Sequence, residues 1–135
     1  MAAERTFPDR VLVTRALISV YDKQDLAELA RGLRQHGVEL VSSGGTFKAL
    51  EEAGIEALPL SAITGETEWI SGRVKTLHPK VHAGILALRG PHDEELAAEG
   101  IPPIDLVVVN LYPFSSVIAD PGTDLARALE IASCC

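Results

Sequence analysis

The segment of residues 72–90, GRVKTLHPKVHAGILALRG, concentrates cations in a chain that is acidic elsewhere. Its basic side chains are Arg73, Lys75, Lys80 and Arg89. No carboxylate lies between Glu68 and Asp93, although the whole chain has 19 acidic and 12 basic side chains. Arginine can hold phosphate oxygens through two hydrogen bonds, and lysine is a point charge that can also transfer protons. Because a neighbouring carboxylate would compete for them, we expect Arg73 and Lys75 to attract a phosphate or a similar anion. A solvated basic loop is the alternative.

A second candidate is the turn formed by Ser43, Gly44, Gly45 and Thr46. Two glycines let the backbone approach a ligand closely, and the start of a helix supplies N–H groups that have no intrahelical partner. The turn matches neither GxGxxG nor GxxxxGK[ST], so the usual nucleotide fingerprints are absent. The sequence therefore indicates an anion-binding turn, with a simple glycine turn between strand and helix as the alternative.

The histidine and cysteine patterns do not predict a metal site. His78 and His82 are four residues apart, but Pro79 and Lys80 occupy the gap in which the HExxH motif places its glutamate. The only cysteines, at 134 and 135, are too few for a zinc site and too close for an unstrained disulfide.

The elements that would position these residues alternate between strand and helix. Apolar runs predict strands at residues 16–20, 39–43, 55–60, 81–88 and within 104–112. Helices are predicted from a cap at Asp22 to the stop at Gly37 (with a stripe of Leu26, Leu29, Ala30 and Leu33), from Thr46 through residue 53, at 92–99 and at 122–132. Residues 61–80 lack periodicity and are predicted to be a long loop with room for one helical turn. The run of three valines at 107–109 indicates a strand covered on both faces, as in a parallel sheet. The fold class is α/β, a three-layer α/β/α domain with a mostly parallel sheet.

Three polar clusters directly follow predicted strands. The clusters are Ser19 with Tyr21, Asp22 and Lys23; residues 43–46; and Asn110 with Tyr112 and Pro113. Because the carboxyl ends of parallel strands share one edge of the sheet, where ligands bind, we expect these clusters to be neighbours in space.

Composition excludes several classes of function. A chain of 135 residues is the size of one domain, and a net charge of −7 argues against general binding to nucleic acid or an anionic membrane. No apolar run approaches the roughly 20 residues that cross a bilayer, and the first residues lack the apolar region of a signal peptide. We therefore expect a cytoplasmic protein.

Four segments of the chain together carry a resemblance to a known family. ALISVYDK (16–23), SSGGT (42–46), GRVKTLHPKVHAGIL (72–86) and VVVNLYPF (107–114) occur in this order. From about residue 13 to 130 the chain resembles the N-terminal IMP cyclohydrolase domain of the bifunctional purine-biosynthesis family, whose other domain is the AICAR formyltransferase. The resemblance implies a methylglyoxal-synthase-like fold for residues 13–135, preceded by an N-terminal tail at 1–12.

The implied reaction is dehydrative closure of the formylated ribonucleotide FAICAR to IMP in purine biosynthesis, without a metal or an organic cofactor and in a homodimer. By motif, Ser43, Gly44, Gly45 and Thr46 would contact the substrate phosphate, with Ser19, Tyr21 and Lys23 near it. Arg73 and Thr76 would complete the nucleotide site, and Asn110 would hold the edge of the base. Lys75 would polarise the reacting base, and Tyr112 would move a proton or donate to the developing oxyanion.

The chain departs from the family pattern at its end. Where the family continues with a segment like IDIGGxxxxRAAAKN, this sequence reads ALEIASCC, so we expect the domain to be C-terminally incomplete, without the Asp and Lys that this segment contributes. The alternative function is therefore nucleotide binding without turnover, either by a fragment or by a regulatory module of the same fold, as in carbamoyl-phosphate synthetase. Methylglyoxal synthase is a further alternative, but no acidic residue accompanies SSGGT here.

Overall fold

The computed structural model describes residues 10–67 and 76–134, so the predicted site residues Arg73 and Lys75 lie outside the described residues. The described strands are β1 (Arg15–Ser19), β2 (Glu39–Ser42), β3 (Leu58–Pro59) and β4 (Leu106–Val109). They form one sheet in the order β3-β2-β1-β4, and every pair is parallel. Leu17 in β1 lies opposite both Val41 and Val107, which fixes the register of the three longer strands.

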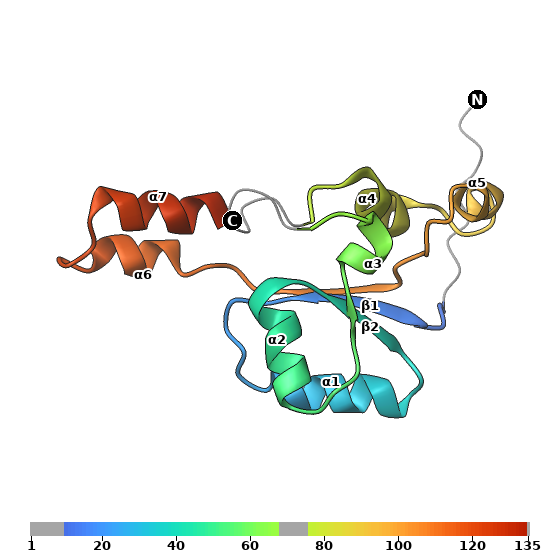
Figure 1. The fold of residues 1–135 in the computed structure, drawn as a ribbon, viewed down its shortest axis with the longest axis horizontal. Coiled ribbons are helices and arrows are strands. Elements are labelled where there is room, and N and C mark those ends of the chain that lie inside the picture. Colours follow the sequence, from blue (N-terminus) through green and yellow to red (C-terminus); the bar gives the residue numbers. More distant parts are fainter. Residues whose placement is uncertain (1–9, 68–75, 135) are drawn as a thin grey trace.

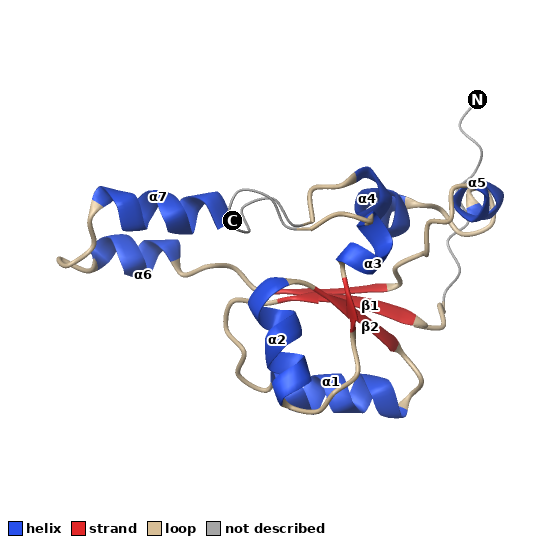
Figure 2. Cartoon of the chain, viewed as in Figure 1, coloured by secondary structure: helices blue, strands red, loops and turns tan. Residues whose placement is uncertain are grey.

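Helices cover both faces of this sheet (Figure 1, Figure 2). The described helices are α1 (Leu26–Gln35), α2 (Gly44–Glu52), α3 (Ser61–Thr64), α4 (Pro79–Leu86), α5 (Asp93–Ala98), α6 (Phe114–Ala119) and α7 (Leu125–Cys134). Helices α1 and α2 lie on one face and α3 and α4 on the other, whereas α6 and α7 contact each other beyond the end of the sheet. The predicted three-layer α/β/α fold is confirmed.

The core is divided by the sheet into two apolar layers. Successive side chains of a strand point to opposite faces. Ala16 and Ile18 therefore pack with α1 and α2, and Leu17 packs on the other face with Val81 of α4. Ile18 is fully buried, and burial of a side chain of this size contributes roughly 1.5–3 kcal/mol. This packing holds the carboxyl end of β1 at the centre of the sheet.

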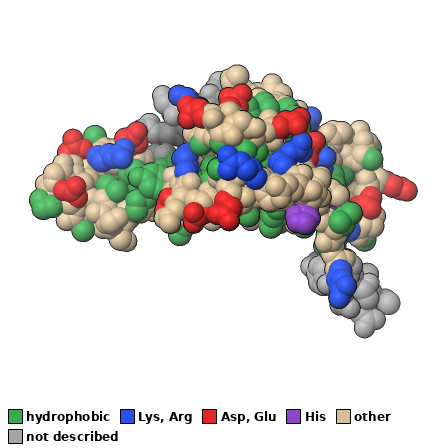
Figure 3. Space-filling model, turned by 90° about the horizontal axis from the view of Figure 1, so that it is seen from below, with side chains coloured by type: hydrophobic (Ala, Val, Ile, Leu, Met, Phe, Trp, Pro, Cys, Tyr) green, Lys and Arg blue, Asp and Glu red, His purple; other side chains and the backbone are tan. Residues whose placement is uncertain are grey.

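Helix α1 presents a charged outer face to solvent. Leu26 and Ala30 are buried against the sheet, but Leu29, which was predicted to share their stripe, is 43% exposed. Figure 3 shows acidic and basic side chains intermixed on the side of the molecule that carries α1 and α2. Among the described residues, no helix combines the length and the apolar character that a bilayer span requires.

The first two helices begin at other residues than predicted. Helix α1 begins after Asp25, which has a left-handed backbone with φ 59°, and not after Asp22. Helix α2 begins at Gly44, two residues before the predicted cap at Thr46, because Ser43 is the last extended residue. The predicted stops are confirmed, since Gly37 and Gly54 both adopt positive φ just beyond the helices.

The prediction of a strand at residues 81–88 was wrong, because this segment is helix α4. The N-cap is His78, whose Nδ1 accepts a hydrogen bond from the N–H of Lys80 at 3.2 Å, and Pro79 occupies the first helical position. Gly84 lets the helix approach the segment before β4 closely, since a Cβ there would lie 2.7 Å from the carbonyl oxygen of Pro102. Val81 and Gly84 of the apolar run are buried, whereas Leu86 is exposed to solvent.

The run of three valines had indicated a strand covered on both faces, and this prediction was wrong. Strand β4 lies at the edge of the described sheet. Val107 is 40% exposed and Val109 is 62% exposed, and both belong to the face of the sheet that carries α4.

Other elements also differ from the prediction. Helix α6 was not predicted, and α7 begins at Leu125 rather than 122. The third strand is shorter than predicted, and α3 is the helical turn of the long loop.

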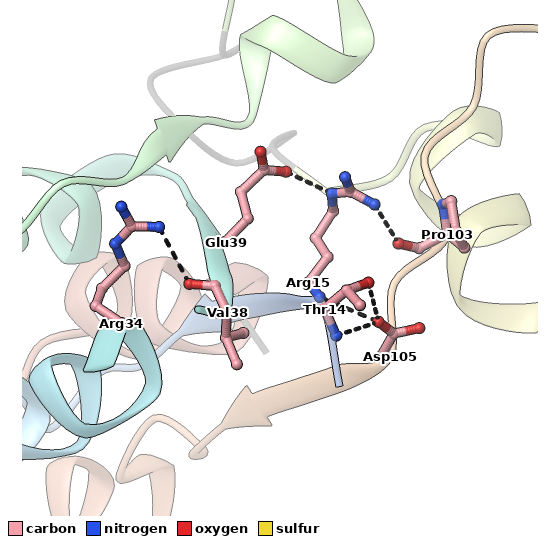
Figure 4. Close-up of polar contacts among 7 residues, drawn as sticks. All are labelled: Thr14, Arg15, Arg34, Val38, Glu39, Pro103 and Asp105. Carbon is pink, nitrogen blue, oxygen red and sulfur yellow. Dashed lines mark hydrogen bonds and ion pairs between the residues drawn. The ribbon is translucent and has the colours of Figure 1, made fainter. Parts of the chain in front are cut away.

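Asp105 joins β1 and β4 where both strands begin (Figure 4). Its Oδ2 accepts hydrogen bonds from the N–H and the hydroxyl of Thr14, both at 2.7 Å, and from the N–H of Arg15 at 3.0 Å. Arg89 forms an ion pair with the same carboxylate. Burial raises the pKa of Asp105, but these hydrogen bonds lower it more, so that its pKa falls from 3.8 to about 2.

We expect Asp105→Asn to lower the free energy of unfolding at neutral pH by about 1–2 kcal/mol, because the charged carboxylate is the stronger acceptor. Since the pKa is lower in the folded state than in the unfolded state, this stabilisation is present above about pH 4 and is lost as the pH falls towards about 2. Urea unfolding of both proteins across this pH range measures the difference.

Asp25→Asn is the matched control, because the Asp25 side chain is exposed and makes no capping hydrogen bond. Its unfolding midpoint should stay close to that of the parent protein. If Asp105→Asn behaves in the same way at neutral pH, the carboxylate does not hold the two strands together.

Candidate functional site

The strand order creates a switch point beside β1. From β1 the chain proceeds to β2 and β3 on one side, and later returns to β4 on the other. In open parallel sheets, ligands bind outside the carboxyl ends of the strands at such a point. A cavity of about 360 Å³ lies here, within the roughly 300–1,000 Å³ typical of small-molecule sites.

The three predicted polar clusters meet around this cavity. The predicted site residues that line it are Ser19, Tyr21, Lys23, Ser43, Gly45, Thr46, Thr76, Asn110 and Tyr112, and Gly44 lies between two of them in the chain. The expectation that these separate segments are neighbours in space is therefore confirmed. Arg73 and Lys75 lie outside the described residues, so their place in the site stays a prediction.

Apolar side chains form one wall of the cavity. Leu17 and Val107 contribute from adjacent strands at the same register, and Val81 and Ile85 contribute from α4. An apolar wall beside polar groups suits a flat heterocycle with polar substituents, because it excludes water from one side of the ligand. The residues of α4 were missed at the sequence level, since residues 81–88 were assigned to a strand. The signal that would have found them is His78 followed by proline, a helix cap with Pro at the first position.

The start of α2 has the properties of an anion cradle. The first N–H groups of any α-helix lack intrahelical partners, and the helix dipole favours negative charge there. Ser43, the N-cap residue, is only 9% exposed, and its buried hydroxyl has no hydrogen-bond partner among the described residues. Gly44 adopts φ 55°, a left-handed conformation that glycine takes without strain. A ligand anion would satisfy both the N–H groups and the hydroxyl.

Lys23 supplies a positive charge beside this cradle. Its ammonium donates to the carbonyl oxygens of Tyr21 at 3.1 Å and Val20 at 3.3 Å. The same nitrogen lies 3.7 Å from the position that a Cβ on Gly45 would occupy. An ammonium group has three N–H donors, so one remains for a ligand oxygen.

Two aromatic rings from different strand ends meet at the cavity. The centroids of Tyr21 and Tyr112 are 4.6 Å apart, and their planes are inclined by 50°. Such tilted pairs contribute about 0.5–1.5 kcal/mol beyond the area that they bury. The contact brings the Tyr112 phenol, the predicted proton carrier, into the group of residues that border the anion cradle.

The histidines of α4 do not form a metal site within the part of the chain that the structure describes. His78 uses its Nδ1 as a helix cap, and no group of three or more His, Cys, Asp or Glu residues suitable for a metal is present in residues 10–67 and 76–134. His82 lines the cavity, and its Nδ1 lies 3.0 Å from the carbonyl oxygen of His78. Because a carbonyl only accepts, Nδ1 carries the proton, which leaves Nε2 available to a ligand.

The fold and the cavity define a class of protein: a parallel α/β domain with a cavity and an anion cradle at the switch point of its sheet. Comparison with known families agrees, since the model of the MGS-like domain matches residues 25–133. The chain belongs to the MGS-like domain family.

Two individual proteins are similar to the chain. The bifunctional purine biosynthesis protein PurH of Chloroflexus aurantiacus is 55% identical over 120 residues, which are 87% of this chain and 23% of that protein. The chain thus spans about a quarter of the length of this relative. The crystal structure of ForH superimposes with a TM-score of 0.67 at 37% identity, covering 75% of this chain and 54% of that chain. The resemblance to the bifunctional purine-biosynthesis family is confirmed.

We expect the two glycines of the cradle to respond differently to alanine. Gly44→Ala should lower the free energy of unfolding by about 1–2 kcal/mol, because an L-residue is strained at its left-handed φ. Gly45→Ala should leave stability unchanged or raise it by up to about 1 kcal/mol, since its added Cβ would meet only the flexible end of Lys23. Urea unfolding of the two variants measures both effects. Equal unfolding midpoints would contradict the left-handed turn at the start of α2.

Proposed function

We propose that this domain is an IMP cyclohydrolase that binds the purine precursor FAICAR and closes its second ring to give IMP. The observation that carries the proposal is the cavity at the switch point, where an anion cradle, a lysine and a tyrosine pair come together. The similarity to PurH, a bifunctional purine biosynthesis protein, supports a ligand of this class.

A ribonucleotide would occupy the cavity with its phosphate at the start of α2. The N–H groups of the first turn, the Ser43 hydroxyl and the Lys23 ammonium would then neutralise the phosphate charge. The base would extend over the apolar wall formed by Leu17 and Val107 towards Tyr112. Arg73 and Thr76 would complete the nucleotide site, as the motif implies.

The ring closure joins the carboxamide nitrogen to the formyl carbon. The carboxamide nitrogen loses one of its two protons as the bond forms, and the formamide nitrogen loses its single proton. The formyl oxygen takes up both protons and leaves as water, so that FAICAR becomes IMP plus water. The enzyme must hold the two groups in contact and stabilise charge on the formyl oxygen. In our proposal Tyr112 donates a hydrogen bond to that oxygen and Lys75 polarises the base.

The proposal is tested by turnover of FAICAR together with calorimetric titration of IMP or AICAR into the same chain. Lys75→Ala should lower turnover by about 100-fold or more, because loss of a proton-transferring or polarising group typically costs that much. Its affinity for the nucleotide should be weaker but measurable.

Lys48→Ala is the control, because the side chain of Lys48 is 75% exposed on α2 and pairs only loosely with Glu52 at 3.9 Å. It should leave turnover and affinity unchanged. Binding without turnover by the parent chain would instead support the regulatory or binding-only alternative. Absence of nucleotide binding would contradict the proposal. The homodimer expected from the resemblance stays a prediction.

A further inference from the structure

We infer that Asn110 and Thr46 are positioning residues: their side chains fix the backbone of residues 20–22, and through it the Tyr21 ring and the Lys23 ammonium, at the edge of the cavity. The inference deepens the proposed function and rests on it for the identity of the ligand. This positioning role differs from the direct ligand contacts that the motif implies for Asn110 and Thr46.

Asn110 binds the loop after β1 through three hydrogen bonds. Its Oδ1 accepts from the N–H of Tyr21 at 2.7 Å and from the N–H of Asp22 at 3.1 Å, and its Nδ2 donates to the carbonyl oxygen of Asp22 at 2.9 Å. Residues 88 and 89 positions apart in the sequence are thus joined. Since no described strand pairs with residues 20–22, the Asn110 amide supplies backbone partners that a neighbouring strand would otherwise provide.

Thr46 binds the same loop from the other side. Its hydroxyl accepts from the N–H of Val20 at 3.1 Å and donates to the carbonyl oxygen of Val20 at 3.0 Å. The residue is 4% exposed, so the arrangement is buried. A hydroxyl has one proton to donate, and here the carbonyl of Val20 receives it. The Thr46 hydroxyl therefore has no proton left for a phosphate, which leaves its backbone N–H as the possible phosphate donor.

The two side chains set the position of the groups that face the ligand. Tyr21 follows directly after Val20, and its N–H is held by Asn110 while its ring packs on Tyr112. Lys23 follows Asp22 and turns back to the carbonyl oxygens of Val20 and Tyr21 beside the cradle. If the loop were free, both the ring and the ammonium would lose their fixed place, and binding would have to order them.

The Asn110 amide retains one donor. Both lone pairs of its oxygen and one of its two N–H groups are engaged by the loop, so one N–H remains for the base of a nucleotide. Asn110 can therefore hold the loop and contact a ligand together. The two roles are separable by experiment, because only the first exists in the ligand-free protein.

The test uses hydrogen exchange in the ligand-free chain, followed by calorimetric titration with AICAR. Asn110→Ala should speed exchange of the Tyr21 and Asp22 amides by about tenfold, and Asn110→Asp, which keeps both acceptors, should retain more of the protection. Affinity for AICAR should fall by about tenfold in Asn110→Ala. Unchanged exchange with weakened binding would overturn the inference, since it would leave only a direct contact.

Thr46 offers a matched pair of substitutions. Thr46→Ser keeps the hydroxyl and should keep both the protection of the Val20 amide and the affinity for AICAR. Thr46→Val has nearly the same shape without the hydroxyl, and should speed exchange at Val20 by about tenfold and weaken binding. Equal behaviour of the two variants would contradict the positioning role.

The inference stays testable if a variant does not fold or if no nucleotide binds. Asn110 is the only asparagine in the sequence, so the unsubstituted protein labelled with ¹⁵N at the asparagine side chain shows a single NH₂ pair. We expect one of its protons to exchange more slowly than the other; equal exchange would overturn the inference. Failure of AICAR to bind while this protection is present would reject the proposed function and not the loop restraint.

Discussion

The start of α2 brings together polar groups that the described protein leaves without partners, and the rest of the site is arranged around them. The first N–H groups of the helix have no acceptor within the helix, and the buried hydroxyl of Ser43 lies beside them. A buried polar group without a partner costs about 1–3 kcal/mol. A bound anion would recover this free energy, so binding of a phosphate would also stabilise the local fold.

The scaffold accounts for the position of this cradle. The parallel sheet places the ends of β1, β2 and β4 at one edge, and the apolar layers on its two faces hold these ends in place. At the opposite end, Asp105 joins the beginnings of β1 and β4. The sheet is therefore held at one end by a charged side chain and carries the start of α2 at the other end.

Much of the architecture could be predicted from the sequence because each signal is local. The apolar runs of β1, β2 and β4 and the glycines after α1 and α2 needed no tertiary information. The turn at residues 43–46 could also be found, since two consecutive glycines between a predicted strand and a predicted helix indicate a turn. The convergence of three clusters followed from the geometry of parallel sheets.

The remaining features depend on contacts distant in sequence. Helix α4 was taken for a strand because its apolar run gives no clear period and its close packing on the segment before β4, permitted by Gly84, is visible only in three dimensions. The exposure of Val109 follows from the place of β4 at the sheet edge, which composition does not specify. The loop restraint by Asn110 joins residues 88 or more positions apart, so no local pattern could reveal it.

The most direct test is an amide NMR titration of the chain with AICAR, compared with the matching nucleoside that lacks the phosphate. If the cradle at α2 holds the phosphate, the N–H signals of Gly44, Gly45 and Thr46 shift strongly with the nucleotide and much less with the nucleoside. If the nucleotide binds while these three signals stay in place, or if the nucleoside shifts them equally, the start of α2 is not the phosphate site.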